Sequence, residues 1–488
     1  MSRVAVQDQQ LLIGGEWSDA EGGATFDKAN PYTGETVTKA AAATPADARR
    51  AVDAAAAAFP EWAALPPSRR RQLLIAAAEL LDERAEQIAA TMVEECGATV
   101  GWGMFNCGLA GGMLREAAAQ AYLPGGDVIP SDVPGLAAMA VRQPVGVVVG
   151  IAPWNAPVIL ATRAVATPLA YGNTVVLKAS EECPRTHAAV ATAIADAGVP
   201  AGVINLLTNA PQDAPQVVEA LIAHPDVRRI NFTGSTRVGR LIAQTAAANM
   251  KRVLLELGGK APMVVLPDAD LDEAVNAANF GAFMNSGQIC MSTERVVVDQ
   301  SLADEFGQKL AERAASLPVG DPSDPGTVIG PVINSSALER IMELIEDAKT
   351  KGARVLAGGE ADGPCIKPTV LADVTPDMRI YHEESFGPVV GLVKVNSRDE
   401  AVEVANDTEY GLAAAVFSRD VPAAMDVARR IQSGICHVNG STVHDEPQMP
   451  FGGVKASGWG RFGGQAALEE FTELRWLSVQ RGNRQYPI

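Results

Sequence analysis

The spacing of apolar residues changes near residue 145. Between about residues 44 and 95 the sequence is typical of helices. Thr44 and Pro45 form a helix start, an alanine-rich run continues to Phe59, and one amphipathic helix is predicted from about residue 67 to 95. Beyond residue 145, short unbroken apolar runs typical of buried strands alternate with helical segments. The change marks the start of an α/β region.

The predicted strands of this region are short and are separated by helical segments. The first series comprises strands at 145–151, 174–177, 203–207 and 229–232, with helices at 186–197 and 237–248. A second series begins at 263–266 and runs to about residue 440. This alternation predicts doubly wound parallel sheets in two α/β domains. A stretch rich in Pro and Gly, 124–144, interrupts the first domain.

Composition and charge narrow the class of protein. A chain of 488 residues is too long for one core, and 47% hydrophobic with 20% charged residues is ordinary for a soluble protein. The net charge of −18 argues against a nucleic acid or an anionic membrane as partner. Residues 1–8 lack the apolar core of a signal peptide, and no apolar run reaches membrane-spanning length. We therefore expect a cytoplasmic protein.

Cysteine is the candidate reactive residue. The five histidines include no HExxH or paired arrangement, so we expect no metal site. The cysteines show no CxxC spacing and are interpreted as free thiols in a reducing compartment; they are Cys96, Cys107, Cys183, Cys290, Cys365 and Cys436.

Cys290 lies directly after a Gly-Gln-Ile turn, and Glu256 lies upstream, followed by Gly258, Gly259 and Lys260. A thiolate that attacks a carbonyl and a carboxylate that later activates water are the two groups that covalent acyl chemistry requires. A cysteine in such a run is by itself more often part of the core than a nucleophile. The pairing with Glu256 favours the nucleophile.

Three further segments follow predicted strands, where ligands bind in open parallel sheets. Residues 232–239 open a helix whose free N–H groups can meet a pyrophosphate, although a plain turn is an equal alternative. Lys178 can bond ribose hydroxyls and Glu181 can accept from a ribose 2′-OH, or the two form a surface ion pair. The Asn155 amide can donate to an oxyanion, or Asn155 is a turn residue.

Together with two more motifs, these three segments, Cys290 and the run from Glu256 closely resemble the NAD(P)-dependent aldehyde dehydrogenase superfamily over essentially the whole chain. The matching segments, in order, are 153–155, Lys178 with Glu181, 232–235, 256–260, the run ending at Cys290, 383–388 and 450–453. The resemblance implies that Cys290 is the nucleophile, Glu256 the general base, and Asn155 with the Cys290 N–H the oxyanion hole.

The resemblance also implies a nicotinamide cofactor. Glu384 would hold the nicotinamide ribose, with Phe386 beside the nicotinamide. The full set of expected cofactor-binding residues is Trp154, Lys178, Glu181, Gly234, Ser235, Gly239, Glu384 and Phe386. We expect NAD, with NADP used less efficiently, because Glu181 would repel a 2′-phosphate.

The family's three-part fold implies a division of the chain. The NAD-binding domain would be 1–123 with 145–257, the catalytic domain 258–470, and a small β oligomerisation element 124–144 with 471–488. A homodimer or homotetramer is expected. One departure concerns proton transfer: many relatives carry a second glutamate where this chain has Phe462, so an auxiliary relay through that position is lost.

Two stretches, 154–163 and 437–446, resemble the vanillin, salicylaldehyde and benzaldehyde dehydrogenases within the superfamily. Ala156 is small and leaves room for an aromatic ring beside Asn155. Arg163 either bonds a ring hydroxyl or forms a structural salt bridge. Ala156, Arg163, Met291 and Phe451 are the expected substrate-binding residues.

The resulting hypothesis is oxidation of an aromatic aldehyde to its carboxylate, with an aliphatic aldehyde or semialdehyde as the alternative substrate. Dehydrogenases that pass the acyl group to CoA generally lack the glutamate found here as Glu256. A cysteine hydrolase without redox chemistry would leave Lys178, Glu181 and Glu384 without a purpose. The intact Cys290 and Glu256 argue against a non-catalytic descendant.

Overall fold

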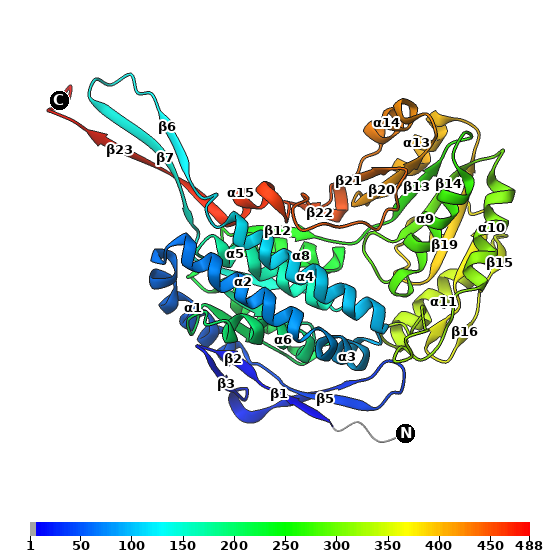
Figure 1. Ribbon diagram of the computed structural model, residues 1–488, viewed down its shortest axis with the longest axis horizontal. Helices are drawn as coiled ribbons and strands as arrows, with labels where there is room; N and C mark the ends of the chain where they lie inside the picture. The colour runs from blue at the N-terminus through cyan, green and yellow to red at the C-terminus, as the bar shows by residue number, and fades with distance from the viewer. Residues whose placement is uncertain (1–5) are drawn as a thin grey trace.

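The computed structural model describes residues 6–488 and shows two α/β lobes with a projecting arm (Figure 1). The sequence-based expectation about the N-terminus rests mainly on residues 1–5, which lie outside the described range. No helix within residues 6–488 is both long and apolar enough to cross a membrane.

The first lobe is built on an eight-stranded sheet whose five central strands are parallel. In spatial order its strands are β22 (Gly458–Trp459), β12 (Arg252–Glu256), β11 (Val227–Thr233), β8 (Val147–Ile151), β9 (Thr174–Lys178), β10 (Ile204–Leu207), β2 (Leu11–Ile13) and β3 (Glu16–Ser18). The strands β8, β9 and β10 are fully buried, which explains why most of their residues are apolar. The short β22 reaches this sheet from the C-terminal part of the chain.

Helices cover both faces of this sheet, as a doubly wound fold requires. One face packs against α2 (Pro67–Glu83), α4 (Val100–Gln120), α5 (Pro157–Ala170) and α6 (Pro184–Asp196). The other packs against α1 (Pro45–Ala64), α7 (Ala214–Ala223) and α8 (Thr236–Ala248). The prediction of one helix over 67–95 is wrong: α2 ends before Arg84, which leaves the helical region at ψ 7°, and α3 (Ala85–Cys96) begins there.

The second lobe has a seven-stranded sheet, parallel except for one edge strand. Its order is β15 (Arg354–Ala357), β18 (Thr369–Ala372), β19 (Val389–Val395), β14 (Thr293–Asp299), β13 (Ala261–Val265), β20 (Ala413–Phe417) and β21 (Ile435–Val438). On one face lie α9 (Leu271–Phe283) and α10 (Ala303–Ala315), and on the other α13 (Arg398–Asn406) and α14 (Val421–Arg430). The predicted fold class, with two doubly wound parallel sheets, is confirmed.

The arm is a three-stranded antiparallel sheet of β6 (Gly126–Ile129), β7 (Leu136–Pro144) and β23 (Thr472–Gln480). It brings together the two segments that were assigned to one small β element, and it extends away from both lobes (Figure 1). The remaining elements are two small sheets, β1 (Gln7–Gln9) with β5 (Thr36–Ala41) and β4 (Thr25–Ala29), and β16 (Ala361–Asp362) with β17 (Cys365–Ile366), together with α11 (Ser335–Thr350), α12 (Arg379–His382) and α15 (Ala467–Phe471).

Candidate active site

The carboxyl ends of four parallel strands bring most of the predicted site residues to one edge of the first sheet. Trp154 and Asn155 follow β8, Lys178 ends β9 with Glu181 just beyond it, Gly234 and Ser235 follow β11, and Glu256 ends β12. The N–H of Gly234 donates to the backbone carbonyl of Glu256 at 3.0 Å, which ties two of these strand ends together. This is the edge at which doubly wound sheets bind ligands.

Cys290 is half-buried, between a short 3-10 turn (Met284–Gly287) and β14. Residues 285–287 all have positive φ, a conformation that residues other than glycine seldom adopt. A Cβ at Gly287 would lie 2.0 Å from the carbonyl oxygen of Gly387, so this close approach requires glycine. The strained turn therefore fixes where the thiol is presented.

Asn155 is buried and bound to the same turn. Its Nδ2 donates to the carbonyl of Gln288 at 3.0 Å, while its own carbonyl accepts from Trp102 Nε1 at 3.0 Å and Asn285 Nδ2 at 2.9 Å. An amide nitrogen carries two N–H groups, and these bonds orient the second one. Preorganised donors of this kind stabilise an oxyanion without reorganising during the reaction.

Glu256 is fully buried, and no N–H or O–H group of the described residues donates to either of its carboxylate oxygens. The thiol of Cys290 is the hydrogen-bonding group that acts on its pKa. Buried polar atoms are almost always satisfied, so this exception points to a bound water or a reacting group. Burial raises the pKa of Glu256 to about 7, against the opposing charge of Arg163. A carboxylate with such a pKa suits general-base work near neutral pH.

Burial and the neighbouring charges of Glu256 and Glu384 raise the pKa of the Cys290 thiol well above its usual value, and Arg163 opposes them. In this state the thiol is protonated. Because only the thiolate is nucleophilic, the proton of Cys290 must leave before attack. Glu256, whose charge acts on the thiol, is placed to receive it.

Lys178 is buried and its Nζ lies 3.1 Å from Glu181 Oε2, so the ion-pair alternative for these residues is present. Burial acts to raise the pKa of Glu181, but Lys178 and a backbone N–H hold it below its usual value. Glu181 is therefore ionised beside Lys178 at the end of β9. Nearby, Ser235 caps α8 by accepting from the N–H of Val238 at 3.4 Å.

Glu384 and Phe386 reach the site from the loop before β19. The N–H of Gly259 donates to Glu384 Oε1 at 2.8 Å, yet burial raises the pKa of Glu384 to about 8. Phe386 meets Trp154 edge-to-face, with ring centroids 5.7 Å apart. A helix N-terminus, carboxylates and aromatic rings at one sheet edge fit the phosphates, ribose hydroxyls and nicotinamide of a dinucleotide.

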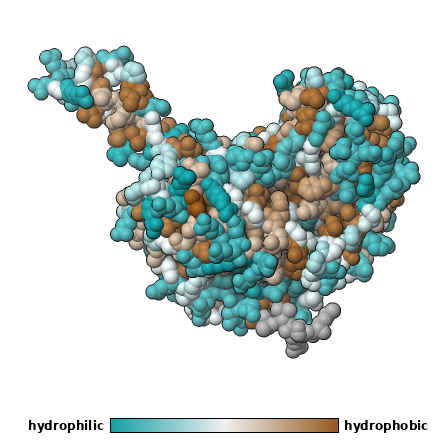
Figure 2. Space-filling view, viewed as in Figure 1, coloured by the Kyte–Doolittle hydropathy of each residue, from teal (hydrophilic) through white to brown (hydrophobic). Residues whose placement is uncertain are grey.

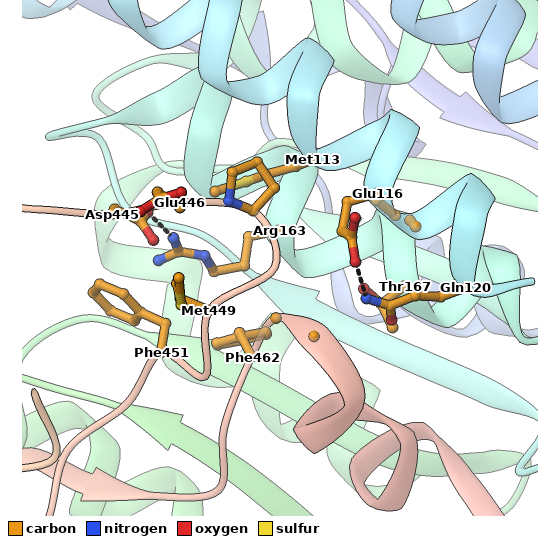
Figure 3. Close-up of a pocket in the computed structure, with 15 residues that line it drawn as sticks. Met113, Glu116, Gln120, Arg163, Thr167, Asp445, Glu446, Met449, Phe451 and Phe462 are labelled. Carbon is orange, nitrogen blue, oxygen red and sulfur yellow. Dashed lines mark hydrogen bonds and ion pairs between the residues drawn. The ribbon is translucent and has the colours of Figure 1, made fainter. Parts of the chain in front are cut away.

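Arg163, on α5, forms a buried ion pair with Asp445, and the two side chains are 7% and 10% exposed (Figure 3). Its guanidinium lies over the ring of Phe451, 4.1 Å from the centroid, and Phe462 lies beyond at 5.9 Å. The structural alternative for Arg163 is thus present, and the partner is a residue that the sequence analysis did not single out.

The Arg163–Asp445 pair lines a pocket between α4, α5 and the C-terminal loops. Its other lining residues are Met113, Glu116, Ala117, Gln120, Ala166, Thr167, Glu446, Pro447, Met449, Phe451, Phe462, Gly463 and Gly464 (Figure 3). The pocket lies near the chemistry, because the charges of both Arg163 and Asp445 act on Glu256. Ala156 and Met291 are buried in the same apolar cluster as Phe451.

Asp53, His224 and Asp226 form the one group among residues 6–488 whose ligand atoms lie close enough for a metal. Both ring nitrogens of His224 are already engaged, Nε2 with Asp53 at 3.2 Å and Nδ1 with the N–H of Asp226 at 3.3 Å. The cluster lies at the start of β11, at the opposite edge of the sheet from Gly234. It is a hydrogen-bonded cluster away from the candidate site.

Four residues at the site were missed or left without a role by the sequence analysis. They are Trp102, Lys260, Glu294 and Asp445. Lys260 and Asp445 lie within stretches that had been noted, and Glu294 stands four residues after Cys290. The identity of each partner depends on contacts between distant segments, which the local pattern does not reveal.

Comparison with known proteins agrees with this site. Residues 17–477 match the model of the aldehyde dehydrogenase family, and the chain belongs to that family, so it is an oxidoreductase. It is 58% identical over 478 residues to a vanillin dehydrogenase of Pseudomonas sp. (strain HR199), covering 98% of this chain and 99% of that protein.

Two solved structures show the same fold. A salicylaldehyde dehydrogenase from Pseudomonas putida G7, complexed with salicylaldehyde, has a TM-score of 0.97 at 46% identity and covers 99% of this chain and 100% of its own. An NADP-dependent enzyme from E. coli has a TM-score of 0.95 at 36% identity, covering 97% and 98%. The resemblance to the aldehyde dehydrogenases is confirmed.

Proposed function

We propose that this enzyme oxidises an aromatic aldehyde to its carboxylate with NAD. The observation that carries the proposal is the fully buried carboxylate of Glu256, to which no N–H or O–H group of the described residues donates and which acts on the half-buried thiol of Cys290 by its charge and by a hydrogen bond. This pair supplies a nucleophile for the aldehyde and a base for the water that releases the acid.

The residues divide the reaction between them. The Cys290 thiolate adds to the aldehyde carbon, and the Asn155 amide with the Cys290 N–H stabilises the resulting oxyanion. A nicotinamide bound beside Phe386 and Glu384 would supply the acceptor for the hydride that leaves that carbon. Glu256 passes the proton of the thiol to solvent and then takes a proton from water, which attacks the thioester and frees the carboxylate and the thiol. Because Glu256 is present, water and not CoA is the expected acceptor of the acyl group.

NAD is the cofactor we favour over NADP. The ionised carboxylate of Glu181 can accept a hydrogen bond from a ribose 2′-OH, whereas it repels a 2′-phosphate. Lys178, 3.1 Å away, partly offsets that repulsion, so some use of NADP is expected. Glu384 would bind the nicotinamide ribose, and the N-terminus of α8 at Ser235 would face the pyrophosphate.

The residues that line the pocket support an aromatic substrate. Phe451 and Phe462 form its apolar wall, and Ala156, next to Asn155, has only a methyl side chain. The relatives named above act on vanillin and salicylaldehyde by their names, and both of these substrates carry a ring hydroxyl. Arg163 and Asp445 together offer a donor and an acceptor to such a hydroxyl.

The arm supports assembly into a homodimer or homotetramer. Figure 2 shows apolar side chains gathered on it, and the exposed ones include Val128, Ile129, Leu474, Trp476 and Val479. An apolar surface of this kind on a projecting sheet is costly in water and marks an interaction site. We infer that it is covered by another copy of the chain.

Reduced-nicotinamide absorbance, recorded with a panel of benzaldehydes and straight-chain aldehydes, tests the proposal. We expect the hydroxylated benzaldehydes to give the highest kcat/KM with NAD, and addition of CoA to change neither rate nor product. A preference for straight-chain aldehydes would refute the aromatic assignment. Strict dependence on CoA would refute the role of Glu256 in hydrolysis.

A further inference from the structure

A second buried ion pair lies beside the site and takes no part in the chemistry described so far. Lys260 Nζ is 2.6 Å from Glu294 Oε2, and the two side chains are 0% and 4% exposed. Lys260 directly precedes β13 and Glu294 is the second residue of the neighbouring strand β14. Desolvating two charges costs about as much as their attraction returns, so such a pair is weak evidence for a purely stabilising role.

The carboxylate of Glu294 also accepts hydrogen bonds from the loop that carries Glu384 and Phe386. Its carboxylate accepts from the N–H of Ser385 at 2.9 and 3.1 Å, from Ser385 Oγ at 2.9 Å and from the N–H of Phe386 at 3.1 Å. Phe386 has a φ of +50°. Successive N–H groups converging on one anion form a nest, a geometry that a left-handed residue makes possible. The Glu294 carboxylate occupies this nest.

The same loop is held from its other side. The guanidinium of Arg340, on α11, donates to the carbonyl oxygens of Glu384 and Ser385 at 2.7 and 2.6 Å. The carboxylate of Glu384 accepts from the N–H of Gly259. Glu294 thus holds the N–H groups of the loop and Arg340 holds its carbonyls, while Lys260 balances the charge of Glu294.

We propose that Glu294, neutralised by Lys260, is a positioning residue that fixes the loop 384–386 and thereby sets the affinity of the site for the nicotinamide nucleotide. Glu294 touches neither reacting atom and acts only through Glu384 and Phe386. The inference rests on the proposed nucleotide-binding role of those two residues. Without Glu294, the strained loop must become ordered when the nucleotide binds, and the free-energy cost of that ordering weakens binding.

Two double variants separate positioning from charge balance. Lys260→Met with Glu294→Gln removes both charges but keeps an oxygen that can accept from Ser385 and Phe386. Lys260→Met with Glu294→Leu removes both charges and the acceptor. Titration calorimetry with NAD and no aldehyde gives the dissociation constant. The rate at which iodoacetamide alkylates Cys290 without NAD shows whether the reactivity of the thiol has changed.

We expect the Leu double variant to bind NAD roughly tenfold or more weakly than the Gln double variant, because only the former must order the loop on binding. The two should alkylate Cys290 at the same rate. Equal NAD affinity in the two double variants would overturn the inference. If the Leu double variant does not fold, Arg340→Met decides: it must also weaken NAD binding, and unchanged affinity would overturn the inference.

Glu384→Gln distinguishes failure of this inference from failure of the proposed function. If Glu384→Gln binds NAD as tightly as the wild type, the nucleotide-binding role of the loop fails and the inference with it. If Glu384→Gln weakens NAD binding but the two double variants do not differ, the proposed function stands and only the positioning role of Glu294 fails.

Discussion

The stability of Glu256→Gln relative to the wild type should increase as pH rises through the range in which Glu256 becomes ionised in the unfolded chain. Burial raises the pKa of this carboxyl from 4.5 to about 7. Between these values the folded protein keeps a proton that the unfolded chain releases, so stability falls as pH rises through this window. The penalty is absent below pH 4.5 and complete above pH 7. Glutamine does not ionise and escapes the penalty.

The size of the effect follows from the raised pKa and from the length of the chain. Each unit of difference between the folded and unfolded pKa values contributes at most about 1.4 kcal/mol to the free energy of unfolding. The wild type is therefore destabilised by about 3 kcal/mol at pH 8.5 and by roughly 1 kcal/mol at pH 5. An unfolding entropy of about 2.1 cal/mol/K per residue gives roughly 1 kcal/mol/K for the whole chain. The Tm difference between Glu256→Gln and wild type should therefore widen by roughly 2–3 °C from pH 5 to pH 8.5.

Differential scanning fluorimetry at the two pH values measures this difference. Comparing pH values cancels the fixed cost of placing an amide among apolar neighbours. Glu219→Gln, at an exposed position on α7, is the matched control, and its Tm difference should not change with pH. A Glu256→Gln difference that is constant, or larger at pH 5, would refute the argument that burial raises the pKa of Glu256 to about 7.

The remaining predictions concern turnover. Cys290→Ala should abolish aldehyde oxidation while leaving NAD affinity unchanged by calorimetry, and substantial residual oxidation would refute the mechanism. Glu256→Gln mixed with NAD and aldehyde should give a burst of reduced cofactor near one per site in stopped flow, then a slow phase, whereas wild-type steady turnover would exclude Glu256 as the base. Glu181→Gln should raise kcat/KM with NADP relative to NAD, and an unchanged ratio would contradict the role of Glu181. Arg163→Leu should raise KM about ten- to a hundredfold for hydroxylated benzaldehydes and much less for benzaldehyde, as expected for a lost charge-assisted hydrogen bond. Equal effects on the two substrates would mean that Arg163 serves only to pair with Asp445.

The core of the fold was predictable because it depends on local patterns. Fully buried parallel strands such as β8 and β9 must be continuously apolar, and helices must alternate with them along the chain. The break at Arg84 was missed for a related reason. The apolar positions of α2 and α3 continue with helical spacing across it, so periodicity alone gives no sign that the chain changes direction.

The reactive residues could be identified from the sequence, but their environments could not. Cys290 and Glu256 are recognisable by type and by neighbouring glycines. The burial of Glu256, which sets its pKa, depends on segments remote in sequence. The partner of Arg163 is Asp445, 282 residues away, and that of Lys260 is Glu294, on the next strand of the sheet. Such pairings are fixed only when the lobes and their loops have packed.

The features that the sequence pattern did not predict all make the folded state less stable locally. Three features oppose folding locally: the buried carboxylate of Glu256, the positive φ at 285–287 and Phe386, and the buried charges of Lys260 and Glu294. They occur where the loops of the second lobe meet the sheet edge of the first. The two large apolar sheets supply the stability that keeps these unfavourable groups in place. The pattern of apolar residues reflects burial that stabilises the fold, so it predicts the sheets well. The residues of the site depart from that pattern, so the pattern does not predict their environments.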